Sequence, residues 1–315
     1  MVLLSFSLSP MSLLRALPGS FAQGLIWGVM ALGVYITFRL LDFADLTVDG
    51  SLATGGAVAV MLIRAGVDPI LSLLAAFAAG MTAGLITGML HTALGIPGIL
   101  SSILTQISLY SINLNIMGKS NQSLNQDKYR LVVSLRYVSG DALMKAKFYG
   151  GLILGCLLLV VILYCYFGTE QGSAIRATGC NKSMAKAQGI NTNFHTVLAL
   201  MLSNGLVGLC GGLFAQYNGA ADVNMGRGAI VYGLAAVIIG EVLFSKLYTG
   251  KHFTFAYTMI AVIGGMVIYY LITAFVLWLK IVPSDDLKLF SAIVVAFFLS
   301  IPYLKEKYGK KRRTA

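Results

Sequence analysis

The segment "SAIRATGCNKSMAKAQGI", residues 173–190, lies between two strongly apolar runs at 148–167 and 193–218. It combines small side chains with basic ones, and it predicts a short helix that is too polar to cross a bilayer. The runs on either side are long enough to cross, because a membrane-spanning helix needs about 20 apolar residues. This alternation predicts spanning helices that are joined by polar segments at the membrane surface.

The composition of the whole chain points to the same class. Of 315 residues, 57% are hydrophobic and 11% are charged, and the mean hydropathy is +0.82. These few charged residues cannot cover the surface of a soluble protein of this size. We therefore expect an all-α polytopic membrane protein. Eight or nine transmembrane or partial helices are predicted in a membrane domain at 20–303, between an N-terminal segment (1–19) and a basic tail (304–315). The long apolar runs are 20–38, 69–94, 97–117, 148–167, 193–218, 254–279 and 286–303, and the shorter or glycine-interrupted ones are 46–63 and 228–245.

Basic residues near the C-terminus predict which side of the membrane each segment occupies. The stretch at 305–315 holds six basic residues and one acid, which favours the cytoplasmic side. The net charge of +11 is therefore a topology signal and does not indicate nucleic-acid binding. Four crossings counted back from this tail place 168–192 on the same side, provided that 228–245 crosses. The polar segment 118–147 is then extracellular, although its six basic residues against two acids oppose that placement.

Two stretches of the chain resemble each other. A shift of 177 residues places "ADLTVDGSLATGGAVAV" (44–60) on "ADVNMGRGAIVYGLAAV" (221–237) and matches Asp45 with Asp222. The second copy lies five apolar runs after the first. Because each run crosses the membrane once and five is odd, the two halves are expected in opposite orientations. Such inverted repeats are typical of transporters, with the substrate path at the repeat interface. A chance similarity between Gly- and Ala-rich helices is the alternative.

Polar residues crowd the first of these stretches. In "RLLDFADLTVDGS" (39–51) three aspartates follow Arg39 at helix-like spacing. Carboxylates facing lipid are costly, so these side chains either lie at the membrane interface, pair with Arg39 or line a polar cavity. Asp45 or Asp49 would also cap the short helix that begins near Thr47. The candidate substrate path consists of Asp45, Asp49, Asn113, Asn204, Gln216, Asn218 and Asp222.

No cofactor or metal site is predicted. The three His residues are far apart, and the four Cys residues show no paired spacing. The stretch "NLNIMGKS" (113–120) has Asn113 where a phosphate-binding loop needs its first glycine. The chain therefore shows no nucleotide-binding motif of its own, nor the catalytic pair that a membrane-embedded enzyme would need.

The segment "GSAIRATGCNKSMAKAQGIN" (172–191) is similar to the cytoplasmic coupling segment of permease subunits in bacterial ABC importers of the branched-chain amino acid and ribose group. The resemblance extends to "LDFADLTVDGS" (41–51) and "GLCGGLFAQ" (208–216), and so covers most of 20–303. A short helix with small side chains suits docking into a partner's groove, whereas an interfacial amphipathic helix is the alternative. The residues that the resemblance assigns to ATPase coupling are Gly172, Arg176, Ala177, Gly179, Asn181, Ala185 and Gly189.

The resemblance also implies partners and a place in the cell. It implies a multi-pass permease in the bacterial cytoplasmic membrane that is not itself an enzyme, with ATP and Mg on a separate ATPase subunit. It further implies an extracellular solute-binding protein that touches 118–147, and a second permease copy, with a homodimer favoured. The expected solute is a small polar molecule, first of all an amino acid and in particular an aromatic one; a sugar, nucleoside or vitamin stays open. The alternative function is an ion-coupled secondary transporter with Asp45, Asp49 or Glu241 at the ion site.

Overall fold

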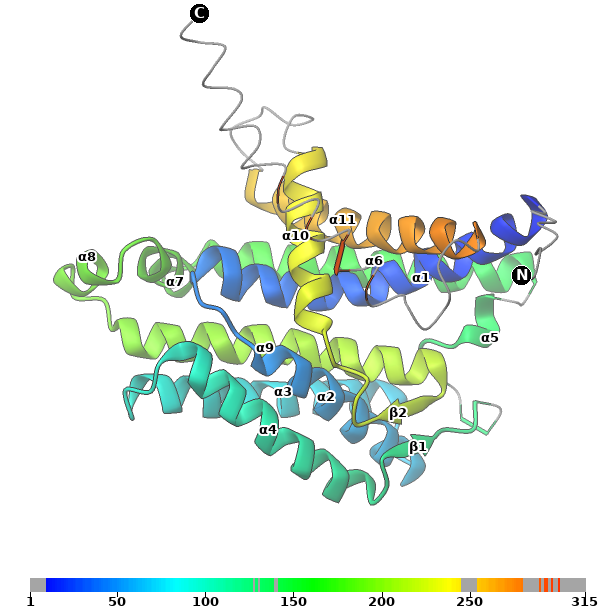
Figure 1. The fold of residues 1–315 in the computed structure, drawn as a ribbon, viewed down its shortest axis with the longest axis horizontal. Helices are drawn as coiled ribbons and strands as arrows, with labels where there is room; N and C mark the ends of the chain where they lie inside the picture. The colour runs from blue at the N-terminus through cyan, green and yellow to red at the C-terminus, as the bar shows by residue number, and fades with distance from the viewer. Residues whose placement is uncertain are drawn as a thin grey trace, which may run out of the picture.

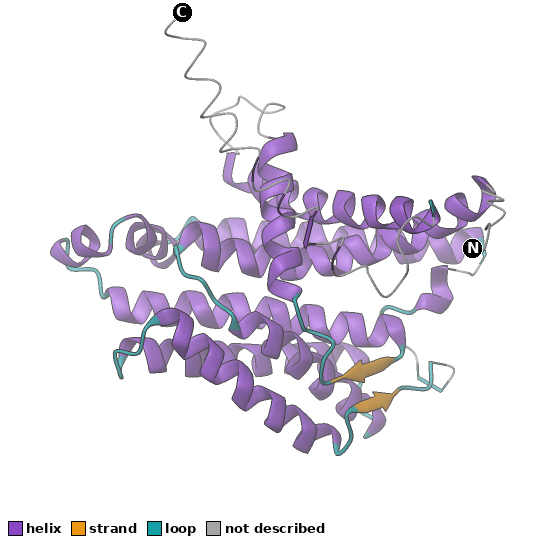
Figure 2. Cartoon of the chain, viewed as in Figure 1, coloured by secondary structure: helices purple, strands orange, loops and turns teal. Residues whose placement is uncertain are grey.

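The computed structural model describes residues 10–126, 128–129, 131–138, 141–244 and 254–279, with a few positions between 289 and 300. The predicted run at 286–303 falls almost entirely outside the described residues, and the basic tail at 304–315 does so completely. In the described part, the chain is helical apart from loops and one pair of short strands (Figure 2).

Six described helices are long and apolar enough to cross a membrane, and each coincides with a predicted run. The helices α1, α6 and α9 lie with their long axes nearly aligned in Figure 1. The prediction of an all-α polytopic membrane protein is confirmed. The bounds are α1 (Pro10–Tyr35), α3 (Pro69–Thr92), α4 (Gly98–Met117), α6 (Ala142–Phe167), α9 (Thr192–Asn218) and α11 (Thr254–Trp278).

Two further helices, α2 (Thr47–Arg64) and α10 (Ala229–Phe244), correspond to the shorter predicted runs. Neither is among the six candidate spans of the described residues. Each begins inside the bundle after a non-helical approach, and Figure 1 shows α10 steeply inclined to α1 and α9. With the six spans they make eight transmembrane or partial helices in the described residues, as predicted.

The core is built around α1, the most buried of the six spans. Trp27 of α1 packs edge-on against Phe214 of α9 and Tyr232 of α10, with ring centroids 5.2 and 5.8 Å apart. Such edge-to-face geometry is favourable for aromatic pairs. These contacts join helices from both ends of the chain into one core.

The two halves of the chain contribute equivalent sets of three helices, and α1 runs antiparallel to α9, its counterpart in the repeat. α1, α2 and α3 form the first set, and α9, α10 and α11 form the second. α1 packs along α11, where a Cβ on Gly28 would lie 3.0 Å from Ile263, and α3 packs along α9, where a Cβ on Gly84 would clash with the Leu200 carbonyl. Each half therefore packs its first helix along the other half's third helix, which supports the predicted inverted repeat.

Different structures lie at the two ends of α6. This helix has 26 residues and is roughly 39 Å long at 1.5 Å per residue. Beside its start lie α5 (Leu135–Val138) and the antiparallel strands β1 (Asn121–Ser123) and β2 (Ala220–Asp222), which we call the strand end. Beyond its last residue lie α7 (Glu170–Cys180) and α8 (Lys182–Ala187), which we call the coupling end. The segments 118–147 and 172–191 therefore lie at opposite ends of the bundle (Figure 1).

The chain leaves α1 at the coupling end through an irregular turn. A π-helix, η1 (Ile36–Leu40), is followed by Asp42, which has a positive φ of 54°. π-Helical turns and non-glycine residues in this region are uncommon and concentrate at functional sites. This turn leads directly into the approach to α2.

Candidate solute path and coupling surface

The two partial helices meet at their N-terminal turns. Asp49, in the first turn of α2, accepts hydrogen bonds from the backbone N–H of Gly228 (2.9 Å) and of Ile230 (3.1 Å). A helix N-terminus carries unpaired N–H groups and a partial positive charge, so this carboxylate caps α10. Asp49 was expected to cap its own helix or to line a cavity; it caps the helix of the other half and also borders the cavity described below.

Asp45 caps α2 instead. Its Oδ1 accepts the N–H of Thr47 at 2.9 Å, and its Oδ2 accepts the Asn204 amide at 2.6 Å. The Asn204 oxygen in turn accepts the Ser51 hydroxyl at 2.6 Å. All four of these residues are buried. The predicted path residues Asp45 and Asn204 therefore join α2 to α9, and neither lines the cavity beside the junction.

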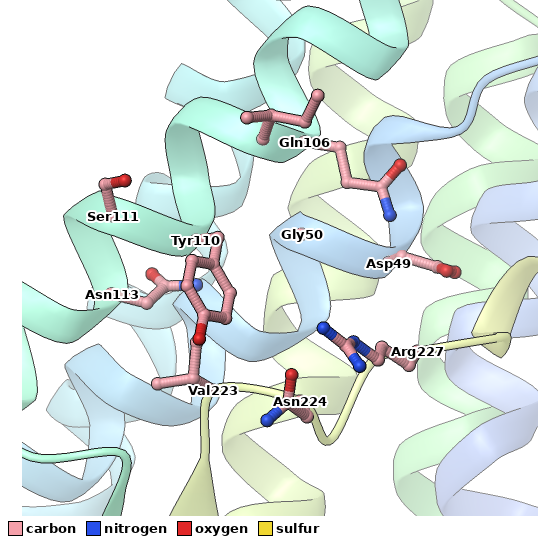
Figure 3. Close-up of a pocket in the computed structure, with 10 residues that line it drawn as sticks. Asp49, Gly50, Gln106, Tyr110, Ser111, Asn113, Val223, Asn224 and Arg227 are labelled. Atoms are coloured by element: carbon pink, nitrogen blue, oxygen red, sulfur yellow. The ribbon is translucent and has the colours of Figure 1, made fainter.

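A cavity of about 360 Å³ opens beside the junction of the two half-helices. Its walls are α2, α4 and the segment 223–227 that follows β2 (Figure 3). The volume falls in the range of small-molecule sites, which combine a few oriented polar groups with apolar surface. The polar and aromatic groups at its wall include Asp49, Gln106, Tyr110, Asn113, Asn224 and Arg227.

Two side chains in this wall, Asn113 and Arg227, have polar groups that are central to its chemistry and have no partner among the described residues. Asn113 is 0% exposed, and neither its amide oxygen nor its amide nitrogen has a hydrogen-bond partner. Arg227 is exposed and forms no ion pair with any described residue. A buried polar group without a partner is costly, so Asn113 marks the cavity as a place where a polar ligand or water belongs.

The other predicted path residues lie away from this cavity. Gln216 is buried and holds α9 to its neighbours, donating to the Pro69 carbonyl at 3.2 Å and accepting from the Val132 N–H at 3.1 Å. Asn218 is the exposed last residue of α9. Asp222, the repeat partner of Asp45, accepts the N–H of Asn224 at 2.7 Å in the turn after β2. Among the seven predicted path residues, only Asp49 and Asn113 line the cavity.

At the coupling end, α7 packs on its own chain. A Cβ at Gly179 would clash with the carbonyl oxygen of Leu40 in η1, and a Cβ at Gly172 would clash with the Phe167 backbone. The Arg176 guanidinium lies over the Phe255 ring, 5.6 Å from its centroid, in a cation–π contact with α11. Ala177 is half-buried beside it. Gly179 therefore positions α7 against the exit of α1, Gly172 positions it against the end of α6, and Arg176 positions it against α11.

The predicted single short helix is in fact two helices. Asn181 is extended (φ −159°, ψ 100°) and its side chain accepts the N–H of Met184 at 2.9 Å, so it ends α7 and caps α8. Asparagine is a preferred N-cap residue, which explains the break. Ala185 is the buried residue of α8, while Met184 is 63% exposed, and Gly189 follows the helix with φ 82°.

Sequence reasoning left Arg227 and Tyr110 out of the candidate path. The shift of 177 residues pairs Arg227 with Gly50, but a charged residue in a turn does not by itself indicate a cavity. The spacing of Gln106, Tyr110 and Asn113 was the available signal, because residues three and four apart lie on one helix face. The approach of 223–227 to that face is a long-range contact that no local pattern shows.

The chain matches the family described as "Branched-chain amino acid transport system / permease component" over residues 17–301. It belongs to this permease family. The permease is 40% identical over 285 residues to the "Tyrosine transport system permease protein" of Clostridioides difficile (strain R20291), covering 88% of each chain. It is 28% identical to the "D-allose transport system permease protein AlsC" of Escherichia coli (strain K12), covering 79% of this chain and 72% of that one. No solved structure gives a significant match.

Membership in this family, with six apolar spans in the described part of the chain, makes the permease a multi-pass protein of the bacterial inner membrane. The permease is also 32% identical to a Rickettsia prowazekii (strain Madrid E) protein, over 90% of this chain and 96% of that one. The predicted kinship with permeases of ABC transporters is confirmed. The relatives' names include both an amino acid and a sugar, so family membership alone leaves the solute class open.

Proposed function

We propose that the permease is the membrane subunit of an ATP-driven importer that moves a small amino acid. A separate ATPase subunit binds ATP and Mg and docks at the coupling end, and an extracellular solute-binding protein delivers the solute at the strand end. Two permease copies form the membrane unit. ATP-driven closure of the ATPase pair shifts α7 and α8, and this shift switches the bundle between outward- and inward-facing states.

The observation that carries this proposal is the exposure of α8. Its described residues other than Ala185 are exposed, including the large apolar side chain of Met184. Lys182 and Lys186 flank Met184 on this helix and supply charge. A short helix with an apolar centre and basic flanks, held by α7 against η1, suits docking into a groove of a protein partner.

The engaged carboxylates argue against an ion-coupled mechanism. Both oxygens of Asp45 and both oxygens of Asp49 accept hydrogen bonds from donors within the chain. Glu241 accepts from Arg39 Nε at 2.8 Å. Each acid that was considered as a coupling site therefore already has a structural partner.

A contrast between α4 and α6 supports the second permease copy. The same share, 28%, of the most apolar window of each helix is buried, so the two helices expose similar fractions. Along α6 between Ile153 and Ile162 the large exposed side chains are Leu, Ile and Val, whereas α4 also exposes Ser108, Ser111 and Asn115. Polar groups are unfavourable against lipid, so α6 suits a lipid-facing position and α4 suits contact with a second copy or with the solute path.

The amino-acid solute is proposed from two sources. The printed name of the Clostridioides difficile relative assigns tyrosine to that protein, at 40% identity. The cavity at the half-helix junction offers charged, amide and aromatic groups in a volume of about 360 Å³. Tyrosine and the other aromatic amino acids are therefore the first solutes to test.

Affinity purification in mild detergent from the native host, followed by mass spectrometry, tests the docking assignment. We expect a soluble subunit with a G-x-x-x-x-G-K-[ST] motif to copurify with the wild-type chain and to be lost from Met184→Asp. Met144→Asp makes the same change at an exposed position in the first turn of α6, at the opposite end, and should retain the subunit. Wild-type permease that purifies without any ATPase, or equal capture by both variants, would contradict the assignment.

A further inference from the structure

We propose that the cavity at the half-helix junction is a solute-binding station for a free amino acid with an uncharged side chain, in which Arg227 binds the carboxylate and Asn113 bonds to the polar groups of the solute. This station rests on the proposed importer function. It goes further, because it assigns selection of the solute to the permease as well as to a binding protein.

The charges around the cavity favour an anionic group. Both Asp49 oxygens are already occupied, because Gly228 and Ile230 at the start of α10 donate to them. Arg227 lines the same cavity and forms no ion pair within the described residues, so its guanidinium is available to an anionic group. Half-helix N-termini near the substrate are a recurring feature of transporter sites. The N-terminal turn of α2 and the residues just before α10 both border this space.

Asn113 provides an observation that is independent of the charges. Both polar atoms of its side chain are buried and have no partner among the described residues, yet the residue lines the cavity. Its amide can donate one hydrogen bond and accept another, as a zwitterionic solute requires. Figure 3 shows Asn113 and Tyr110 on α4, opposite α2 and the 223–227 segment that carries Arg227.

The remaining wall limits the class of solute. Gln106, Ser111 and Asn224 add uncharged polar groups, and the Tyr110 ring adds an aromatic surface that suits either an aromatic side chain or an ammonium group. Among the described residues, the Arg227 guanidinium has no ion pair, while both Asp49 oxygens already accept hydrogen bonds. The site therefore offers a partner for a carboxylate and no free carboxylate for a basic side chain. A cavity of about 360 Å³ lies at the small end of ligand sites, which suits a single amino acid.

The test is a thermal-unfolding screen of the purified permease–ATPase complex, without the solute-binding protein. The probes are the twenty standard amino acids, the carboxamide of each amino acid that shifts the midpoint of unfolding, and D-ribose and D-allose as neutral polyols. We expect at least one amino acid with an uncharged side chain to raise the midpoint of unfolding, and its carboxamide to fail. The concentration of that amino acid that gives half of the shift should rise at least tenfold in Arg227→Gln and in Asn113→Leu.

Lys145→Gln removes the same charge at an exposed position outside the cavity and should behave as the wild type. No shift with any amino acid, an equal response to the responding amino acid and its carboxamide, or an unchanged response in Arg227→Gln would each overturn the station. A complex that copurifies intact but shows one of these results leaves the importer function standing. A chain that captures no ATPase contradicts the importer function itself.

Discussion

The half-helices α2 and α10 are equivalent in the inverted repeat, yet their N-terminal turns are built differently. The turn of α2 is buried and closed by Asp45, which is held by Asn204 of α9. The turn of α10 is closed by Asp49, which comes from α2 itself. One half thus supplies the cap for both helices, so the position of α10 depends on the position of α2.

The difference also explains why the cavity lies on one side of the junction. Gly50 and Arg227 are repeat partners, and both border the cavity. At Gly50 there is no room for a side chain, because a Cβ would lie 2.9 Å from Leu109 of α4. At the equivalent position in the second half, the long side chain of Arg227 reaches open space. The two half-helices are related by the repeat, but the cavity beside them is therefore asymmetric.

The contact at the centre of the junction should be the most sensitive. Gly226 and Asp49 are repeat partners that touch, and a Cβ at Gly226 would clash with the Asp49 carbonyl oxygen. Gly226→Ala should therefore separate the two turns, abolish uptake and lower stability by about 1–3 kcal/mol or more. Gly155→Ala, with nothing near its Cβ on α6, is the control and should retain uptake. Wild-type uptake by Gly226→Ala would show that the turns need not touch.

The buried cap of α2 should matter more than its repeat equivalent. Asp45→Ala removes the acceptor of the Thr47 N–H and of one N–H of the buried Asn204 amide, whose other hydrogen bond to the Leu200 carbonyl remains. Each lost bond should cost about 1–3 kcal/mol. Asp222→Ala removes one bond in a half-exposed turn and should cost about 0.5–2 kcal/mol at most. Thermal unfolding of the two variants in detergent compares them directly. Equal losses would mean that the two turns are alike after all.

The cap that crosses between the halves should affect transport more than stability. Asp49→Ala removes the acceptor for Gly228 and Ile230 and should cost about 0.5–2 kcal/mol, as for other N-caps. It should also reduce ATP-driven uptake at least tenfold, because α10 no longer follows α2. Asp49→Asn keeps one acceptor oxygen and should be intermediate in both measurements. Full uptake by Asp49→Ala would remove the proposed link between the half-helices.

The smallest effect is expected at the far end of α10. Glu241 accepts from Arg39 at 2.8 Å, and the Arg39 side chain is 57% exposed. Exposed ion pairs contribute about 0–1 kcal/mol, so Glu241→Gln and Arg39→Gln should each lower the unfolding temperature only slightly. A large loss in either variant would show that this anchor, and not the junction, holds α10.

Much of the helix arrangement could be predicted from the sequence. The apolar runs located the six described spans, since length and hydropathy are local properties. The two shorter runs and the repeat at a shift of 177 residues pointed to α2 and α10 as partial helices. The segment at 173–190 could be predicted to lie at the membrane surface, because it is polar, rich in small residues and placed between two apolar spans.

The site could be predicted only in part. Asp49 and Asn113 were singled out as polar residues within or beside apolar runs, and both line the cavity. Which helix Asp49 caps depends on the approach of Gly228, a contact between residues 179 positions apart in the chain. Arg227 was missed for the same reason, because its cavity exists only where α4 meets the second half. The break at Asn181 followed a local rule, since asparagine is a preferred N-cap residue, and could have been read from the sequence.

The measurement that tests the central claim most directly is uptake of labelled amino acids into proteoliposomes that contain the permease, its ATPase and its binding protein. We predict uptake that requires ATP on the ATPase side and the binding protein on the other side, that is insensitive to collapse of proton and sodium gradients, and that is lost in Gly226→Ala. Uptake by the permease alone, driven by an ion gradient and independent of ATP, would contradict the account.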